Sequence, residues 1–427
     1  MNNTTNTPPS FSNKNLATET RGAIFTRTIL LLSFVSLLAD IASEMLYPII
    51  PLYLQEIGFG MIGLGLLEGA AGALAGISKG YFGKLSDDRQ VRMPFVRGGY
   101  LLSALSKPAM VLFRATAWVF AARLSDRLGK GIRTGARDAI LSAETSPETK
   151  GRVFGFHRAM DTTGAVLGPL LALGLLAVYP QQYRLIFLLS IIPGLLSVLL
   201  TFFVKEPANK HHSKAQNLSD NTSKPKPNRF SFFSFAGYWW QSSALYKRLL
   251  AGLLVFGLVN SADMFLLVRL RELGAGDSGV IGAYIFFNFV YAIFAYPVGL
   301  LADKLGFRPT IAGGLLLFAV VYGGLAIGAS YTVAIGLFFI YGIYSAATES
   351  VAKAWISNIC LLEQTGTAIG TYTAFNSIAT LLAGLWTGVV WQNWGGQTAL
   401  AISAIVAFMA AGYFSLLKNE ATRENGV

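Results

Sequence analysis

The sequence predicts an all-α membrane protein with twelve transmembrane helices in two six-helix bundles that are related by an internal repeat. Apolar residues make up 53% of the 427-residue chain and charged residues only 13%, about half the charged share of a typical soluble protein. The charges are also clumped, because no Asp, Glu, Lys or Arg occurs from Pro309 to Thr348 or from Gln364 to Leu417. Such long charge-free stretches are typical of membrane spans of ~20 residues laid end to end.

The apolar runs define the spans, which lie between two polar tails. Residues 1–26 and 418–427 form the tails, and the first lacks the apolar stretch expected of a cleaved signal peptide. Six spans are predicted to form an N-terminal bundle over 27–204, and six a C-terminal bundle over 247–417. In chain order, the predicted spans are 27–54, 61–83, 95–113, 117–143, 153–178, 184–204, 247–270, 278–302, 309–328, 331–359, 366–390 and 396–417.

Residues 205–246 are predicted to link the two bundles. The first part, residues 205–230, is rich in Lys, His, Ser, Asn and Pro, which is the composition of a linker. The stretch Phe230–Trp240 that follows is aromatic and is flanked by the basic residues Arg229 and Lys247. An aromatic segment between basic residues is predicted to lie on the membrane surface.

The formal net charge of +12 is spread unevenly across the predicted membrane. Most of the 34 Lys and Arg residues lie on the side that holds both tails and the linker. This bias follows the positive-inside rule and predicts cytoplasmic termini in the cell inner membrane. The basic clusters lack the aromatic interleaving of a nucleic-acid site. The basic clusters are therefore expected to contact the lipid bilayer and not DNA or RNA.

The few reactive side chains argue against an enzyme or a metalloprotein. Cys360 is the only cysteine, and two of the three histidines lie in the linker. A disulfide framework and a cysteine-based metal cluster are therefore excluded. There is also no nucleotide-binding loop or nucleophile–base arrangement in the sequence. No catalytic residue, metal or cofactor is expected.

The two halves of the chain repeat the same landmarks at nearly constant spacing. At an offset of 216 residues, Glu56-Ile57-Gly58 aligns with Glu272-Leu273-Gly274, Gly83 and Asp87 with Gly299 and Asp303, and Arg133 and Arg137 with Glu349 and Lys353; at an offset of 215, Gly151 and Gly155 align with Gly366 and Gly370. Parallel six-span repeats with a solute site at their interface are a known plan of membrane transporters. The alternative is a duplicated helical scaffold that transports nothing.

The loop after the second span, Gly83–Arg92, carries the first family resemblance. It resembles the G-x-x-x-D-R-x-G-R-[KR] loop of the major facilitator superfamily, with Asp88 and Gln90 as departures, and Gly299–Arg308 is its echo. The resemblance implies a transporter of that family in which this loop acts as a conformational latch between the halves. The residues implied in gating are Gly83, Asp87, Arg92, Gly299, Asp303 and Arg308.

Two further stretches resemble particular branches of the superfamily. Gly164-x-x-x-Gly168-Pro169 in the fifth span resembles the G-x-x-x-G-P element of the family's antiporters, although Ala172-Leu173 stands where those proteins have a glycine pair. Small residues let helices approach closely, and a proline weakens the backbone ladder, so this span is expected to bend at a tight contact. The stretches Arg123–Ala139 and Gly155–Asp161 resemble a subgroup of bacterial permeases. Antiport is therefore favoured over symport.

The fourth span carries an unusual stripe of charge. Five cations recur every three or four residues, which places them on one helical face: Arg123, Arg127, Lys130, Arg133 and Arg137. Asp126 and Asp138 lie beside the stripe. A charge at the bilayer centre costs at least ~2.5–3.5 kcal/mol, so the stripe is expected to face carboxylates or a wet cavity. The alternative is a solvated helix face near the cytoplasm, chiefly for Arg137 and Asp138.

Carboxylates in the first two spans are the expected partners of these cations. Asp40 is predicted near mid-membrane, Glu44 one turn further out on the same face, and Glu68 in the outer third of the second span. We expect Arg123 and Arg127 to pair with Glu44 and Glu68, and Asp40 to face Arg127 or Lys130. The alternative is permanent ion pairing that only locks helices together.

A proton-coupling role is the functional interpretation of these charges. A nearby cation favours the charged form of a carboxyl group, whereas burial favours the neutral form. A carboxyl group that meets a cation in one conformation only can therefore bind and release a proton. We predict that Asp40 or Glu44, gated by Arg127, is that group.

The C-terminal half has fewer intramembrane charges. They are Asp263, Glu349 and Lys353, and the last two are spaced i, i+4 and are expected to pair along one helix facing the cavity. His157, Arg158 and Asp161 in the fifth span are expected to brace the cytoplasmic gate. The aromatic and amide side chains predicted to contact a solute are Tyr284, Asn288, Tyr341, Tyr344 and Asn376.

The leading hypothesis is a monomeric, proton-coupled antiporter that exports a small organic compound by alternating access. The alternative is a symporter or exchanger for an organic anion, motivated by the cationic fourth span. Internal pairing of most of the cations favours the first; two or more free cations in the cavity favour the second. A receptor or channel on the same scaffold is the third class, but the two latch loops argue against it.

Overall fold

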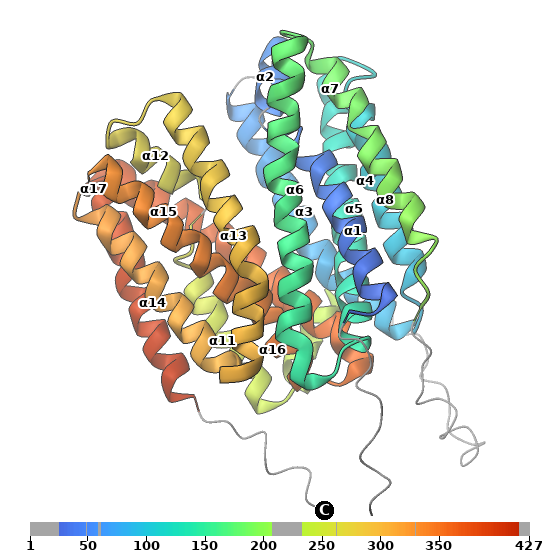
Figure 1. Cartoon of the computed structure of the whole chain (residues 1–427), viewed down its shortest axis with the longest axis vertical. Helices are drawn as coiled ribbons and strands as arrows, with labels where there is room; N and C mark the ends of the chain where they lie inside the picture. The colour runs from blue at the N-terminus through green and yellow to red at the C-terminus, as the bar shows by residue number, and fades with distance from the viewer. Residues whose placement is uncertain are drawn as a thin grey trace, which may run out of the picture.

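The structure, a computed structural model, describes residues 25–47, 49–58, 61–206, 233–261, 263–328 and 330–417. Almost all of these residues are helical, and no strand occurs among them. The helices form two bundles that stand side by side (Figure 1). Most of the predicted linker, residues 207–232, lies outside the described residues.

The N-terminal bundle contains the first six spans. Its helices are α1 (Arg27–Glu44), α2 (Ile50–Glu56), α3 (Met61–Asp88), α4 (Met93–Ala109), α5 (Thr116–Ala143), α6 (Lys150–Val178), α7 (Tyr183–Leu189) and α8 (Ile191–Thr201). The pairs α1/α2 and α7/α8 are each one predicted span that the structure divides in two.

The C-terminal bundle contains the last six spans. Its helices are α10 (Tyr238–Gln241), α11 (Ala244–Gly257), α12 (Met264–Glu272), α13 (Asp277–Leu305), α14 (Phe307–Ala326), α15 (Tyr331–Ser345), the π-helical turn η3 (Ala346–Ser350), α16 (Val351–Ile359) and α17 (Thr365–Leu416). Gly395 has non-helical dihedral angles inside α17 (φ 85°) and separates its two spans. A positive φ is accessible to glycine at no steric cost.

The length and composition of several of these helices indicate directly that they cross a membrane. Six stretches of the described chain are long and apolar enough to cross a bilayer, the last of them being Leu362–Leu416 with its two spans. The other five predicted spans, namely the first, second, third, fourth and seventh, are not among these stretches; the first and seventh are broken, and the fourth carries many charges. The first break follows Glu44, and the second lies between Gly257 and Met264, so the breaks correspond under the 216-residue repeat.

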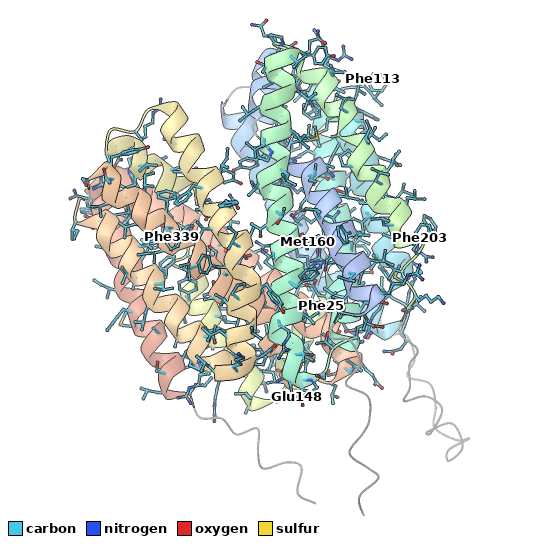
Figure 2. The ribbon with its side chains drawn as sticks, in the orientation of Figure 1. Phe25, Phe113, Glu148, Met160, Phe203 and Phe339 are labelled. Carbon is cyan, nitrogen blue, oxygen red and sulfur yellow. The ribbon has the colours of Figure 1, made fainter. Side chains whose placement is uncertain are left out.

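The two bundles contact each other mainly through α3 against α17 and α13 against α6. They converge at the end where α1 begins and α17 ends, and diverge at the opposite end (Figure 1). We call the convergent end the latch end. Near it, Phe25 packs against Phe156 of α6 and Tyr296 of α13, with ring centroids 4.7 and 5.8 Å apart (Figure 2).

Candidate functional site

The first latch joins α3 to the start of α17. Asp87 is buried, and its carboxylate accepts hydrogen bonds from the Thr367 backbone N–H at 2.6 Å and the Thr367 hydroxyl at 2.9 Å. Arg92 donates to Asp87 at 3.4 Å and to the carbonyl of Leu362 at 3.2 Å, so it touches both halves. A carboxylate at the first turn of a helix is stabilised by the unpaired N–H groups and the helix dipole. Asp87 therefore caps a helix of the other half.

The second latch repeats this arrangement between α13 and the start of α6. Asp303 accepts from the backbone N–H groups of Gly151 and Arg152 at 2.7 and 3.0 Å, and from Arg152 Nε at 2.9 Å. At both latches glycines are required, because a Cβ on Gly83 or on Gly299 would collide with a carbonyl oxygen of the other half. The sequence repeat thus folds into two copies of one contact.

Arg308 does not take part in the second latch, contrary to the expectation from the loop pattern. Its guanidinium donates to the carbonyls of Leu417 and Ser415 at 2.7 and 2.6 Å. These are unpaired carbonyls at the C-terminal end of α17, and cations commonly satisfy such groups. Arg308 therefore holds its own half together, and Arg152 supplies the latch cation in its place.

A layer of ion pairs crosses the interface just beyond the latches. Lys353 Nζ lies 2.8 Å from Asp138, which also accepts from Arg137 at 3.0 Å. Arg158 lies 2.5 Å from Glu349, and the Tyr291 hydroxyl donates to the same carboxylate at 3.0 Å.

The predicted internal pair of Glu349 with Lys353 is wrong, because each residue pairs with the N-terminal half. Glu349 lies in the π-helical turn η3, and Lys353 lies in α16 beyond it. A π-turn has a wider i→i+5 repeat, so residues four apart no longer lie one above the other. The two side chains reach Arg158 and Asp138 instead.

The ion-pair layer continues into the N-terminal half through Ser36. Arg137 donates to the Ser36 hydroxyl at 2.8 Å, and this hydroxyl donates to Asp161. Arg158 closes the chain by donating to the other oxygen of Asp161 at 3.0 Å. Of the three residues expected to brace the gate, Arg158 and Asp161 pair with each other, and His157 Nδ1 lies 3.3 Å from the Ser33 hydroxyl.

Further from the latches, Arg123 of the fourth span lies beside a carboxylate that also binds α4. Arg123 lies 3.5 Å from Asp126, three residues along the same helix, and Lys107 of α4 lies 3.0 Å from that carboxylate. Asp126 also accepts from Ser103 at 2.6 Å. Arg127 has a partner as well. The side chain of Glu68 lies outside the described part of the chain, so the pairing of Glu68 with Arg123 or Arg127 remains a prediction.

The two carboxylates of α1 differ from all of these. Asp40 is only 7% exposed, and within the described residues its carboxylate makes no hydrogen bond or ion pair. Glu44 is half-buried and, over the same residues, equally unpaired. The antiporter-like motif packs on this stretch: a Cβ on Gly164 would lie 2.9 Å from Asp40 Cβ, and one on Gly168 would lie 3.0 Å from Glu44 Cβ. Pro169 follows inside α6.

Two cations of the stripe also lack a carboxylate among the residues that the structure describes. Lys130 is half-buried. Arg133 is buried over the Tyr100 ring, 4.2 Å from its centroid, and its Nε and Nη1 have no acceptor. Arg133 thus packs against α4, and both Lys130 and Arg133 are among the electrostatic neighbours of Asp40.

Sequence reasoning missed two lysines. Lys107 is buried beside Asp126. Lys79 is half-buried where α3 meets α5 and α17, since its backbone lies close to Gly131, Gly135 and Gly370. A single lysine in an apolar span is itself a signal, because intramembrane ionisable residues are rare and usually functional.

Comparison with known proteins identifies the family. The model of the Major Facilitator Superfamily matches residues 32–287 and 270–426. The chain belongs to the Major Facilitator Superfamily. Members of this superfamily are transporters and not enzymes. The two matches of the family model fit the two six-helix halves of the chain. An uncharacterized MFS-type transporter of Methanocaldococcus jannaschii is 32% identical over 374 residues, covering 86% of this chain and 89% of the relative. An uncharacterized protein of Mycobacterium bovis is 24% identical over 381 residues, covering 89% and 90%.

Solved structures share the superfamily fold at low identity. The human organic anion transporter MFSD10 (TETRAN) is 18% identical with a TM-score of 0.69, covering 91% of this chain and 99% of its own. The Escherichia coli fucose:proton symporter FucP, in the outward conformation, is 16% identical with a TM-score of 0.72, covering 91% and 99%. These likenesses show the fold of this superfamily member and leave its cargo open.

The predicted solute contacts of this transporter fall into two groups. Tyr284 stacks across the interface on Tyr47 of the other half, with centroids 5.8 Å apart and planes at 8°. The Tyr341 hydroxyl donates to Asp263 at 2.6 Å. Tyr344, in contrast, is buried in an aromatic core, 5.0 Å from the Phe318 ring centroid.

The two predicted amide contacts pack close to their own half. Asn288 donates to the carbonyl of Tyr284, one turn away on the same helix, at 3.0 Å. Asn376 lies against the end of α11, where its side-chain oxygen would be 2.8 Å from a Cβ on Gly257. Charged side chains between the halves are nevertheless accessible, since the Glu349 side chain is 54% exposed and Asp263 is also exposed. Both carboxylates are therefore accessible to solvent beyond the ion-pair layer.

Proposed function

We propose that this transporter exports a small organic compound in exchange for protons, by alternating access, with the latch end and both termini facing the cytoplasm. The observation that carries the proposal is the Asp40 carboxylate, which is buried among the described helices without a partner. An unpaired charge at membrane depth is expensive. A carboxyl group can avoid this cost by binding a proton, so Asp40 is suited to exchange protons.

The surroundings of Asp40 are suited to this exchange. Its electrostatic neighbours are Lys130 and Arg133 of α5, Asp161 of α6 and Glu44 of its own helix. Cations favour the charged form of a carboxyl group, and burial or a neighbouring carboxylate favours the protonated form. Admitting water from one side or the other shifts this balance, so the proton can be bound on one side and released on the other.

The ion-pair layer is suited to make that change alternate. In the present state Lys353 and Glu349 bind Asp138 and Arg158 of the other half. When the halves separate at the latch end, both bridges break, and water reaches Asp161 and then Asp40 from that side. The likeness to FucP in its outward conformation supports an outward-facing state with a closed cytoplasmic side.

Transport of an organic anion is the second candidate function. Lys79 and Lys130 are half-buried, and neither makes an ion pair within the described residues. The structural likeness to a human organic anion transporter is consistent with it. Against it, Arg123, Arg127 and Arg137 all have partners, so most of the fourth-span charge is already engaged.

The test uses purified protein in liposomes with an imposed pH gradient and a dye that reports internal pH. Cationic, neutral and anionic solutes are added in turn. We expect an organic solute to elicit proton movement, and Asp40→Asn to reduce it at least tenfold. Glu56→Gln is the matched control, because Glu56 forms only a loose, exposed pair with Arg114 at 3.7 Å.

Each outcome of this assay decides one part of the proposal. Proton movement that persists in both Asp40→Asn and Glu44→Gln contradicts the role of the α1 carboxylates. Proton movement with anions alone favours the second candidate. Solute flux that never moves a proton rejects coupling altogether.

A further inference from the structure

The first and seventh spans are broken at corresponding places. α1 ends at Glu44, and α2 begins only at Ile50. α11 ends at Gly257, and α12 begins only at Met264. Interrupted helices at matching positions of two repeats are a strong pointer to a binding site. The C-terminal end of a helix carries a partial negative charge. The ends of α1 and α11 therefore favour a cation, and Asp263 adds a negative charge at the N-cap position of α12.

Two carboxylates from opposite halves lie at these breaks. Glu44 is the last residue of α1 and has no partner within the described chain. Asp263 is exposed and, over the same residues, accepts a hydrogen bond only from Tyr341. Both carboxylates are electrostatic neighbours of the Tyr284 hydroxyl, and Tyr284 stacks on Tyr47, three residues after Glu44.

Asp40 gives independent support for a ligand of positive charge. It lies one turn below Glu44 on the same helix face, is nine-tenths buried and has no hydrogen-bond partner among the described side chains. A buried polar group without a partner needs an explanation. Lys130 and Arg133 are its electrostatic neighbours but make no ion pair with it among the described residues, so the two α1 carboxylates leave room for a positively charged ligand.

Aromatic rings complete the site. Tyr47 of the N-terminal half is 52% exposed and stacks on Tyr284 of the C-terminal half. Tyr284 in turn packs edge-on against Phe287, and Phe287 against Tyr341, both with centroids 5.4 Å apart. Aromatic faces beside carboxylates are the chemistry that recognises organic ammonium ions.

We propose that this broken-helix junction, formed by Glu44, Tyr47, Asp263 and Tyr284, binds an organic cation with its charge between the two carboxylates and its apolar part against the two rings. The inference rests on the proposed function, since it names the substrate class of that transporter. The site takes one carboxylate and one ring from each half, so its occupancy depends on how the halves are arranged. Of the two lysines without an ion pair among the described residues, Lys130 of α5 is an electrostatic neighbour of Asp40, and Lys79 lies on α3 where it meets α5 and α17.

Equilibrium binding to the purified full-length protein, without any gradient, tests the site. The probe is tetraphenylphosphonium, and benzoate is the anionic comparison. We expect Glu44→Gln and Asp263→Asn each to weaken probe binding about tenfold, or ~1.4 kcal/mol, and Tyr284→Leu to weaken it severalfold. Glu44→Asp, which keeps the charge, should retain most of the affinity. Glu56→Gln and Tyr179→Leu are controls at exposed positions of the same half.

The binding result and the transport result separate the two proposals. Probe binding that is lost in the carboxylate variants, while no solute moves a proton, supports the site and rejects the proposed coupling. Proton-coupled transport combined with unchanged probe affinity in both carboxylate variants rejects the site and leaves the coupling intact. Binding of benzoate in place of the phosphonium also overturns the inference. Thermal melting of each variant shows whether a loss reflects misfolding.

Discussion

The latch end and the broken-helix junction treat carboxylates in opposite ways. At the latch end Asp87, Asp303, Asp138 and Glu349 each have a partner in the other half. At the junction Glu44 has none within the described residues. Both regions lie between the same two bundles. The difference indicates that paired carboxylates hold one conformation, whereas unpaired ones are kept for something that binds and leaves.

Packing differs between the two regions in the same sense. At the latch end backbones approach so closely that only glycine fits at Gly83 and Gly151. At the junction the contact is made by two tyrosine side chains, Tyr47 and Tyr284. Backbone contact without side chains forms a rigid closure, while side-chain contact can adjust to a ligand of variable shape.

The largest effect is expected from filling the glycine contact of the first latch. In Gly83→Val the new side chain meets the carbonyl of Gly366, so the latch end cannot close. We expect transport to fall more than tenfold and the distance between spin labels on the latch-end turns of α3 and α17 to increase, in a Cys360→Ser background. Gly72→Val on the same helix is the control, because a Cβ there meets nothing within 4 Å. Wild-type distances in Gly83→Val would show that closure does not need this contact.

An intermediate effect is expected from breaking one cross-interface ion pair. Lys353→Met removes the partner that Asp138 has in the other half, while Arg137 stays in place. Losing a hydrogen bond to a charged group costs ~1.5–3 kcal/mol, so the population separated at the latch end should rise about 10- to 100-fold. The same spin-label distances measure it. Lys84→Met, which breaks an exposed pair with Asp88, should change little, and equal effects from the two variants would contradict the special role of the layer.

The family resemblance placed the two latch loops at the glycines and aspartates that make these contacts, and the determinants of the contacts are local. A glycine and an aspartate four residues apart at a helix end, repeated at a constant offset, define both the close contact and the cap. Thr367 and Gly151, which complete the caps, follow from geometry once α17 and α6 begin where they do. Arg308 was misplaced, because a loop pattern does not show which nearby carbonyls lack a donor.

The ion pairs could not be predicted in the same way. Many cations and carboxylates occur at compatible depths, and helical spacing alone permits several pairings. The π-turn at Ala346–Ser350 has no evident sequence signal, yet it decides that Glu349 and Lys353 point to different partners. Asp126 pairs with Lys107 of another helix, which helical spacing within the fourth span does not show. Asp40 and Glu44 stood out in the sequence as intramembrane carboxylates, but only the structure shows that they make no ion pair or hydrogen bond with the residues it describes.

The smallest effect is expected from pH at the first latch. Asp87 lies past the end of the second span, and burial raises its pKa to about 6 from an ordinary value of 3.8, even though Thr367 and Arg92 oppose this by favouring the charged form. Because the closed latch binds the proton more tightly than the exposed carboxyl group, closure is favoured as pH falls from about 6 towards 4 and is insensitive to pH well above 6. Around pH 6 the closed-to-open ratio should change about threefold per pH unit. Asp87→Asn should abolish this dependence in the spin-label distances, and Asp88→Asn, which alters an exposed neighbour, should keep it. A closed population that grows with rising pH would mean that the latch is held by the charged carboxylate, and that at this end the hydrogen bonds of Thr367 and Arg92 outweigh the cost of burial.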